Sequence, residues 1–149
     1  MKKLKKPIIK VSKVIDDCID NMNPSLVKTE IINSKGIFNT AETEYEDKIT
    51  KNELYKIPTE VDVNLTLNSE ELKKLYTYRL LNKKNKARIH YDNIFILAPN
   101  GKCPLCSQRI VRTLDHHLPK SKYPIYSIIP INLVPSCSDC NKDKLVELP

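Results

Sequence analysis

Two pairs of cysteines near the carboxyl end of the chain have the spacing of metal-binding knuckles. They are Cys103 with Cys106 and Cys137 with Cys140, and thirty residues separate the two pairs. A Cys-x2-Cys turn presents two sulfurs from one knuckle, and four thiolates complete the tetrahedral shell of a structural zinc ion. The pattern therefore predicts one closed Zn²⁺ site with no sulfur left over.

Two disulfides or four free thiols are the alternatives to a zinc site. Disulfides belong to exported proteins, and the start of the chain, MKKLKKPIIKVSKVI, lacks the apolar run of a signal peptide. No stretch approaches the ~20 apolar residues that cross a membrane. We therefore expect a cytoplasmic chain with reduced cysteines and no membrane partner. The fifth cysteine, Cys18, lies in an apolar helical pattern and is expected to be a small core residue.

A second group of chemically active residues lies between and just after the knuckles. Asp115, His116 and His117 follow the β-prone run 110–114, and Asn141 follows the last cysteine. A carboxylate and an amide carbonyl are hard oxygen ligands, which suit Mg²⁺ or Mn²⁺. A neighbouring histidine that titrates near neutral pH can accept the proton of an attacking water. These groups together are those needed to hydrolyse a phosphodiester.

The elements expected around these residues would bring them together. The order along the chain is a knuckle, strand 110–114, a loop rich in proline, strand 131–134, the second knuckle and a helix over 138–148 with Ser138 as its N-cap. Zinc would join the start of the first strand to the start of the helix. The turn at Asp115 should therefore meet the first helical turn, where Asn141 lies.

The stretch from Gly101 to Lys144 resembles the HNH endonucleases, which have the ββα-metal fold. The similarity rests on Leu-Asp-His-x-x-Pro at 114–119, Asn-Leu-Val at 132–134 and Cys-x2-Cys-Asn-x2-Lys at 137–144, and it covers about a third of the chain. The resemblance implies a metal-dependent nuclease that cuts DNA. Its motifs resemble in particular those of nucleases from prokaryotic defence or restriction systems, which are often encoded with an ATPase partner.

The resemblance also implies a role for individual residues. Asp115 matches the first ligand of the catalytic metal, and Asn141 falls where the family has its second ligand. His116 matches the general base, and Asn132 matches the residue that braces the hairpin around the base. His117 departs from the family, which has an apolar residue there. Successive strand residues point to opposite faces, so one of the two histidines would face the metal, and the resemblance favours His116.

Basic residues around the predicted site are candidates for phosphate contacts. The predicted nucleic-acid-binding residues are Lys120, Lys122, Lys142, Lys144 and Arg112. Sequence-independent phosphate contacts of this kind are what a DNA-cutting enzyme needs. The alternative for each is an ordinary solvated surface residue.

The first hundred residues are expected to be mostly helical, with segregated charge. Residues 14–62 hold five basic and eleven acidic residues, although the whole chain has a net charge of +7. The acidic segment should face solvent or a protein partner rather than DNA. Apolar spacing and capping patterns predict helices over 11–22, 25–49, 68–82 and 85–97. The second has an interruption near Gly36, and Asn68 and Glu71 form a capping box for the third. A strand or extended linker is expected over 61–67. Three tyrosines on these helices could stack on bases but are expected in the core or an interface: Tyr76, Tyr78 and Tyr91. His90 has no evident partner in the sequence.

We therefore predict an α+β chain with a mostly helical region over residues 1–98 and a small zinc-stapled ββα-metal module over 99–149. The predicted function is that of a DNA endonuclease. Two alternatives are a non-catalytic zinc module that binds nucleic acid and a zinc-stabilised module that binds protein. Neither alternative explains why an aspartate, a histidine and an asparagine accompany the cysteines.

Overall fold

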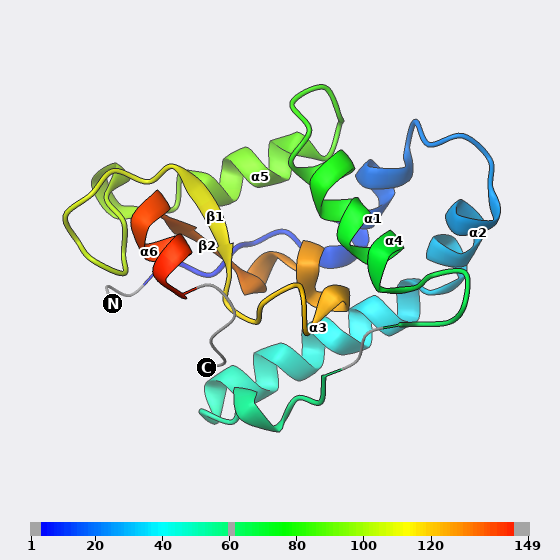
Figure 1. The fold of residues 1–149 in the computed structure, drawn as a ribbon, viewed down its shortest axis with the longest axis horizontal. Helices are drawn as coiled ribbons and strands as arrows, with labels where there is room; N and C mark the ends of the chain where they lie inside the picture. The colour runs from blue at the N-terminus through cyan, green and yellow to red at the C-terminus, as the bar shows by residue number, and fades with distance from the viewer. Residues whose placement is uncertain (1–3, 60–61, 145–149) are drawn as a thin grey trace.

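The computed structural model describes residues 4–59 and 62–144, with Lys144 described by its backbone alone (Figure 1). It contains helices α1 Val11–Ile19, α2 Leu26–Asn33, α3 Lys35–Thr50, α4 Ser69–Lys74, α5 Arg88–Phe95 and α6 Ser138–Lys144, and strands β1 Thr113–His116 and β2 Leu133–Ser136. The mixture of helices with a small two-stranded sheet confirms the α+β class. Figure 1 shows α6 beside the β1–β2 hairpin, α5 also contacts both strands, and α2 lies at the opposite end of the molecule.

Helix α1 forms where apolar residues recur at helical spacing. Val11, Val14, Ile15 and Cys18 are fully buried, which confirms the predicted apolar face and places Cys18 in the core. Burial raises the pKa of the Cys18 thiol to about 12, as expected for an inert core cysteine. The helix has no side-chain cap of its own. Instead, the carboxylate of Glu42 on α3 accepts the N–H of Val11 at 3.0 Å.

The predicted helical stretch 25–49 is present as two helices, with the break near Gly36 that the sequence predicts. The hydroxyl of Ser25 accepts the N–H of Lys28 at 3.1 Å and caps α2. The break falls at Ser34, whose N–H bonds both the Glu30 and Ile31 carbonyls. Gly36 lies in the first turn of α3 rather than at the break.

The predicted helix 68–82 also forms, with a change of geometry along its length. The Asn68 side chain accepts the N–H of Glu71 at 3.1 Å, which confirms Asn68 as the N-cap. After α4 the chain widens into a π-helix over Leu75–Leu80, closed by the Leu81 N–H to Tyr76 carbonyl bond of 2.8 Å. Such π turns are rare and often lie at functional sites.

The strand or linker predicted over 61–67 is not a strand where the structure describes it. Residues 60 and 61 lie outside the described residues. In the remainder, the side chain of Asn64 accepts the N–H groups of Thr66 and Leu67 at 3.0 and 2.8 Å. This Asx turn satisfies the backbone locally and competes with strand pairing.

The sheet is an antiparallel hairpin whose strands lie slightly later in the chain than predicted. Asp115 pairs with Val134, and His116 pairs with Leu133. The first strand starts at Thr113 because Ile110 is already used in a bridge to Lys102 within the knuckle. The second starts at Leu133 because Pro130–Asn132 forms a 3₁₀ turn.

Helix α6 begins as predicted, but its cap differs. The cap position is Cys137, whose sulfur accepts the N–H of Cys140 at 3.4 Å. The expected cap, Ser138, is the first helical residue instead. The predicted end of this helix lies outside the described residues.

One continuous hydrophobic core extends through both of the predicted segments. It includes Phe38 and Tyr45 from α3 together with Leu114, Leu118 and Ile129 from the carboxyl-terminal part. The division between residues 1–98 and 99–149 stays a prediction. Within residues 4–59 and 62–144, no helix is both long and apolar enough to cross a membrane.

A buried polar pair joins two helices that are distant in sequence. Nε2 of His90 on α5 lies 2.5 Å from Oδ2 of Asp17 on α1, so His90 has a partner that its sequence neighbourhood does not reveal. Burial opposes ionisation of Asp17, but hydrogen bonds from His90 and Lys13 outweigh it and hold the pKa of Asp17 below its usual range.

Candidate active site and metal centre

The four knuckle cysteines meet at one point. The sulfur atoms of Cys103, Cys106, Cys137 and Cys140 all lie within 4.8 Å of one another, and all are thiols rather than disulfides. Zinc–sulfur bonds of about 2.3 Å in a tetrahedron separate the sulfurs by about 3.8 Å, and Cys106 and Cys137 are 4.0 Å apart. The cluster could therefore hold a zinc ion, as the spacing predicted.

The surroundings of the sulfurs favour a bound cation. Backbone N–H groups of Arg109 and Gln108 lower the pKa of Cys106 to about 6. Contact with the sulfur of Cys137 raises the pKa of Cys140 to about 12. Closely spaced thiolates repel one another, so ionisation of one cysteine makes ionisation of the next less favourable. A bound divalent cation offsets this repulsion.

The first knuckle is shaped by a residue in the left-handed backbone region. Ser107 has a φ of 60°, and its N–H donates to the Cys103 carbonyl at 2.7 Å. This conformation turns the chain back so that Cys103 and Cys106 face the same point. Glycine adopts it without steric cost, whereas serine does not.

A cleft of about 390 Å³ brings together three of the four predicted catalytic residues, Asp115, His116 and Asn141, whereas the fourth, Asn132, does not line it. The lining also includes Lys120 from the loop after β1, Lys142 from α6 and Tyr76 from the π-helix. The hairpin supplies Asp115 and His116, and the knuckle at the start of α6 brings Asn141 to them. Asp115 and His116 are largely buried, with exposed fractions of 5% and 8%.

The imidazole of His116 is fixed by a backbone carbonyl. Nε2 lies 2.9 Å from the carbonyl oxygen of Ser127. A carbonyl can only accept, so Nε2 carries the hydrogen, and in the neutral ring Nδ1 is the basic nitrogen. The Ser127 hydroxyl in turn donates to the carbonyl of Leu72 at the end of α4, at 3.1 Å. The ring orientation therefore depends on packing between the loop and α4.

Asn132 ties the ends of the loop between the two strands. It is fully buried. Its Oδ1 accepts the N–H of Leu118 at 2.7 Å, while its Nδ2 donates to the carbonyls of Leu118 and Tyr126, each at 3.1 Å. Its own carbonyl accepts the N–H of His117 at 2.9 Å. The side chain acts on the site by holding the loop that carries Ser127.

His117 lies on the other side of the hairpin. Its side chain lines an apolar hollow with Pro7, Tyr45 and Leu133, which are not part of the cleft. It is half-buried there. The two adjacent histidines therefore have different surroundings, and His116 is the one that lines the cleft with Asp115.

The predicted phosphate-binding residues are not all in one place. Lys120 and Lys142 line the cleft. Lys122 is exposed and does not line it, and Arg112 lines a separate hollow beside the knuckles. The side chain of Lys144 lies outside the described residues.

Tyr76 is buried in the core, as the sequence predicts, and it also lines the cleft, which the sequence does not predict. Its ring meets that of His116 edge-on, with centroids 4.4 Å apart, and the Lys120 ammonium lies 5.0 Å from its centroid. Burial, followed by repulsion from Lys73, lowers the pKa of Lys120. No local pattern could have found Tyr76, because its partners lie forty or more residues away and a π turn sets its direction.

Comparison with known proteins identifies a homologue in a phage. The chain is 34% identical over 149 residues to Protein ea31 of Escherichia phage lambda, with 95% of this chain and 50% of that protein covered. It thus spans about half the length of the curated relative that it matches. No family model matches the chain, and no solved structure matches it. The comparisons therefore establish a phage relative of this chain.

Proposed function

We propose that this chain is an HNH-type endonuclease that hydrolyses phosphodiester bonds of DNA with the help of a divalent metal ion. One observation carries the proposal: Asp115, His116 and Asn141 line the same cleft. A zinc cluster alone requires none of these side chains. A carboxylate and an amide oxygen that can bind a metal ion, together with a histidine base, are the groups that metal-dependent phosphoester hydrolysis requires.

His116 is the proposed general base. With Nε2–H held by the Ser127 carbonyl, Nδ1 is the basic ring nitrogen that would accept the proton of the attacking water. The hydroxide formed would attack phosphorus, and the bond from phosphorus to the 3′ oxygen would break. That oxygen then takes up a proton, which leaves a 3′-hydroxyl and a 5′-phosphate.

Asp115 and Asn141 are the proposed ligands of a Mg²⁺ or Mn²⁺ ion. Both line the cleft, and carboxylate and amide oxygens are the donors that such ions prefer. The ion, when bound, would stabilise the charge that develops on the phosphate and the leaving oxygen. The two residues would also keep the phosphate next to His116.

The cations of the cleft are proposed to bind the DNA backbone. Lys120 lies against the Tyr76 ring and Lys142 is exposed at the edge of the cleft. Contacts to phosphate of this kind do not depend on base sequence. A role in prokaryotic defence or restriction, with an ATPase partner, is the biological setting proposed from the resemblance.

The metal dependence of cleavage tests the proposal. Zinc-loaded protein should nick supercoiled plasmid DNA on addition of Mg²⁺ or Mn²⁺ and should not nick it when neither ion is added. Asn141→Ala should lower the rate at least about tenfold and raise the Mg²⁺ concentration needed for half activity, because one of two protein ligands is lost. The control is Asn93→Ala, an exposed asparagine of α5 outside the cleft. Equal rates for the two variants at every Mg²⁺ concentration would contradict the assignment of Asn141.

A further inference from the structure

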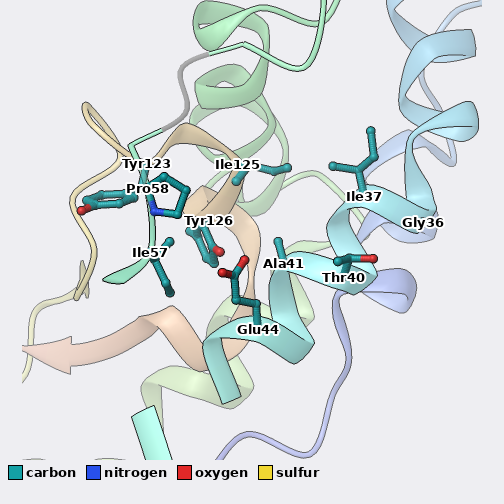
Figure 2. A pocket seen from close by; sticks show the side chains of 10 residues that line it. All are labelled: Gly36, Ile37, Thr40, Ala41, Glu44, Ile57, Pro58, Tyr123, Ile125 and Tyr126. Atoms are coloured by element: carbon teal, nitrogen blue, oxygen red, sulfur yellow. The ribbon is translucent and has the colours of Figure 1, made fainter. Parts of the chain in front are cut away.

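A second cavity lies between α3 and the loop that follows β1. Its volume is about 310 Å³, and its lining includes Ile37, Ala41 and Glu44 from α3, Pro58, and Tyr123 and Tyr126 from the loop (Figure 2). It shares no residue with the cleft that holds Asp115. We propose that this cavity is a docking site for an arginine side chain of a protein partner. The charge, the aromatic walls and the size of the cavity fit such a side chain.

The cavity contains a carboxylate that the fold itself does not use. Of the four acidic side chains of α3, Glu42 accepts the N–H of Val11, Glu46 pairs with Lys10, and Asp47 pairs with Lys51. No residue within 4–59 and 62–144 forms a hydrogen bond or an ion pair with the Glu44 carboxylate, which is half-buried. Figure 2 shows this carboxylate directed toward the cavity beside Tyr126. The site therefore presents one negative charge for a ligand to neutralise.

The other walls favour a planar cation with an aliphatic stem. The rings of Tyr123 and Tyr126 meet at 79° with centroids 6.3 Å apart, and Ile37, Ala41 and Pro58 supply apolar surface. Tyrosine rings attract cations through their faces. Arginine combines a forked donor for a carboxylate with a flat group that stacks on aromatic rings, which lysine does not. The volume is near the lower limit of about 300 Å³ for ligand sites, which suits a single long side chain.

Charge also selects the class of partner. Residues 14–62, which include α3, carry eleven acidic and five basic residues. Nucleic acid is repelled by such an acidic segment, whereas a basic segment of a protein is attracted to it. The partner is therefore expected to be a protein that presents an arginine on a basic surface.

The cavity adjoins the segment that orients His116. Tyr126 and Ser127 are neighbours in the 3₁₀ segment Pro124–Ile128. Tyr126 lines the cavity, and the carbonyl of Ser127 accepts the hydrogen bond from Nε2 of His116. An arginine that packs against Tyr126 would shift or fix this segment, and so adjust the general base. This regulatory step rests on the proposed function, whereas the docking site does not.

Nuclear magnetic resonance of the zinc-loaded chain tests docking directly. The probe is N-acetyl-arginine methylamide, and the matched control is its neutral citrulline analogue. We expect the arginine probe to shift the methyl signals of Ile37 and Ile125 in a saturable way and the citrulline probe to bind at least fivefold more weakly. Glu44→Gln should weaken arginine binding at least fivefold. Asp47→Asn, which removes the same charge from an exposed site on α3, should change it less than twofold.

Each other outcome decides against part of the proposal. Equal binding of the two probes, no saturable shift, or equal effects of the two variants would overturn the arginine site. Dimerisation of the chain alone in sedimentation, lost in Glu44→Gln, would make a second copy the occupant and overturn the choice of partner. A site that binds arginine without any shift of the His116 ring signals would overturn the regulatory step. None of these measurements needs nuclease activity, so they remain decisive if the nuclease proposal fails.

Discussion

Replacing Asn132 with alanine is expected to destabilise the protein more than any other change at an asparagine near the site. The side chain is fully buried and forms three hydrogen bonds with the backbone of the loop that holds His116. The substitution removes all three and leaves one N–H and two carbonyl groups without these partners. The N–H and one carbonyl belong to Leu118, and the other carbonyl belongs to Tyr126, which still accepts the N–H of Ile129 at 3.3 Å.

The size of the effect follows from the buried groups left behind. A buried backbone group that loses its partner costs about 1–3 kcal/mol. Entry of water into the space left by the amide would offset part of this cost. We expect Asn132→Ala to lower the free energy of unfolding by about 3–5 kcal/mol. In a chain of this length that corresponds to a fall in the unfolding temperature of about 10 °C.

Urea unfolding of zinc-saturated protein, followed by circular dichroism, measures this loss. The control is Asn141→Ala, because Asn141 is half-exposed on α6 and the change there should cost under about 1 kcal/mol. Asn132→Asp keeps the acceptor for the Leu118 N–H but loses both donors, so it should also cost more than about 2 kcal/mol. A loss below about 1 kcal/mol for Asn132→Ala would refute the reasoning that this side chain holds the loop.

Three further predictions concern the metal, the polar pair and the aromatic wall. The purified chain should carry one zinc ion by elemental analysis, and Cys137→Ser should lower both zinc content and unfolding temperature; an unchanged temperature would contradict a structural role. Because the pKa of Asp17 is lowered in the folded state, its stabilisation is present above the unfolded value of about 3.9 and is lost as the pH falls through the folded value. Urea midpoints measured from pH 2 to 6 should therefore depend less on pH in Asp17→Asn, and an unchanged slope would count against the pair with His90. Tyr76→Leu should slow plasmid nicking about fivefold to tenfold by removing the ring from Lys120 and His116, while Tyr76→Phe keeps it within about threefold; equal rates would exclude a role for the ring.

The features that could be predicted from the sequence are those encoded over short distances. The Cys-x2-Cys spacing predicts a cluster of four sulfurs because each knuckle is a single local turn. The cap at Asn68 is confirmed for the same reason, since donor and acceptor lie three residues apart. The apolar spacing of α1 likewise gives its buried face.

The features that could not be predicted depend on contacts between distant segments. Asp17 meets His90 across 73 residues, and Tyr76 meets His116 across forty. The π-helix depends on backbone hydrogen bonds that many sequences can form. The cap of α6 differs from the prediction because the sulfur of Cys137, rather than the neighbouring hydroxyl of Ser138, accepts the N–H of Cys140.

The comparison of two adjacent histidines tests the central proposal most directly. His116 lines the cleft with Asp115, whereas His117 lines the apolar hollow on the other side of the hairpin. We would measure Mg²⁺-dependent nicking of supercoiled plasmid by the wild type, His116→Ala and His117→Ala, with zinc content verified in all three. The proposal predicts that His116→Ala loses at least about a hundredfold in rate while its zinc content and DNA binding stay unchanged. His117→Ala should stay within about fivefold of the wild type. Cleavage by His116→Ala at the wild-type rate, or an equal loss in both variants, would contradict the assignment of His116 as the base.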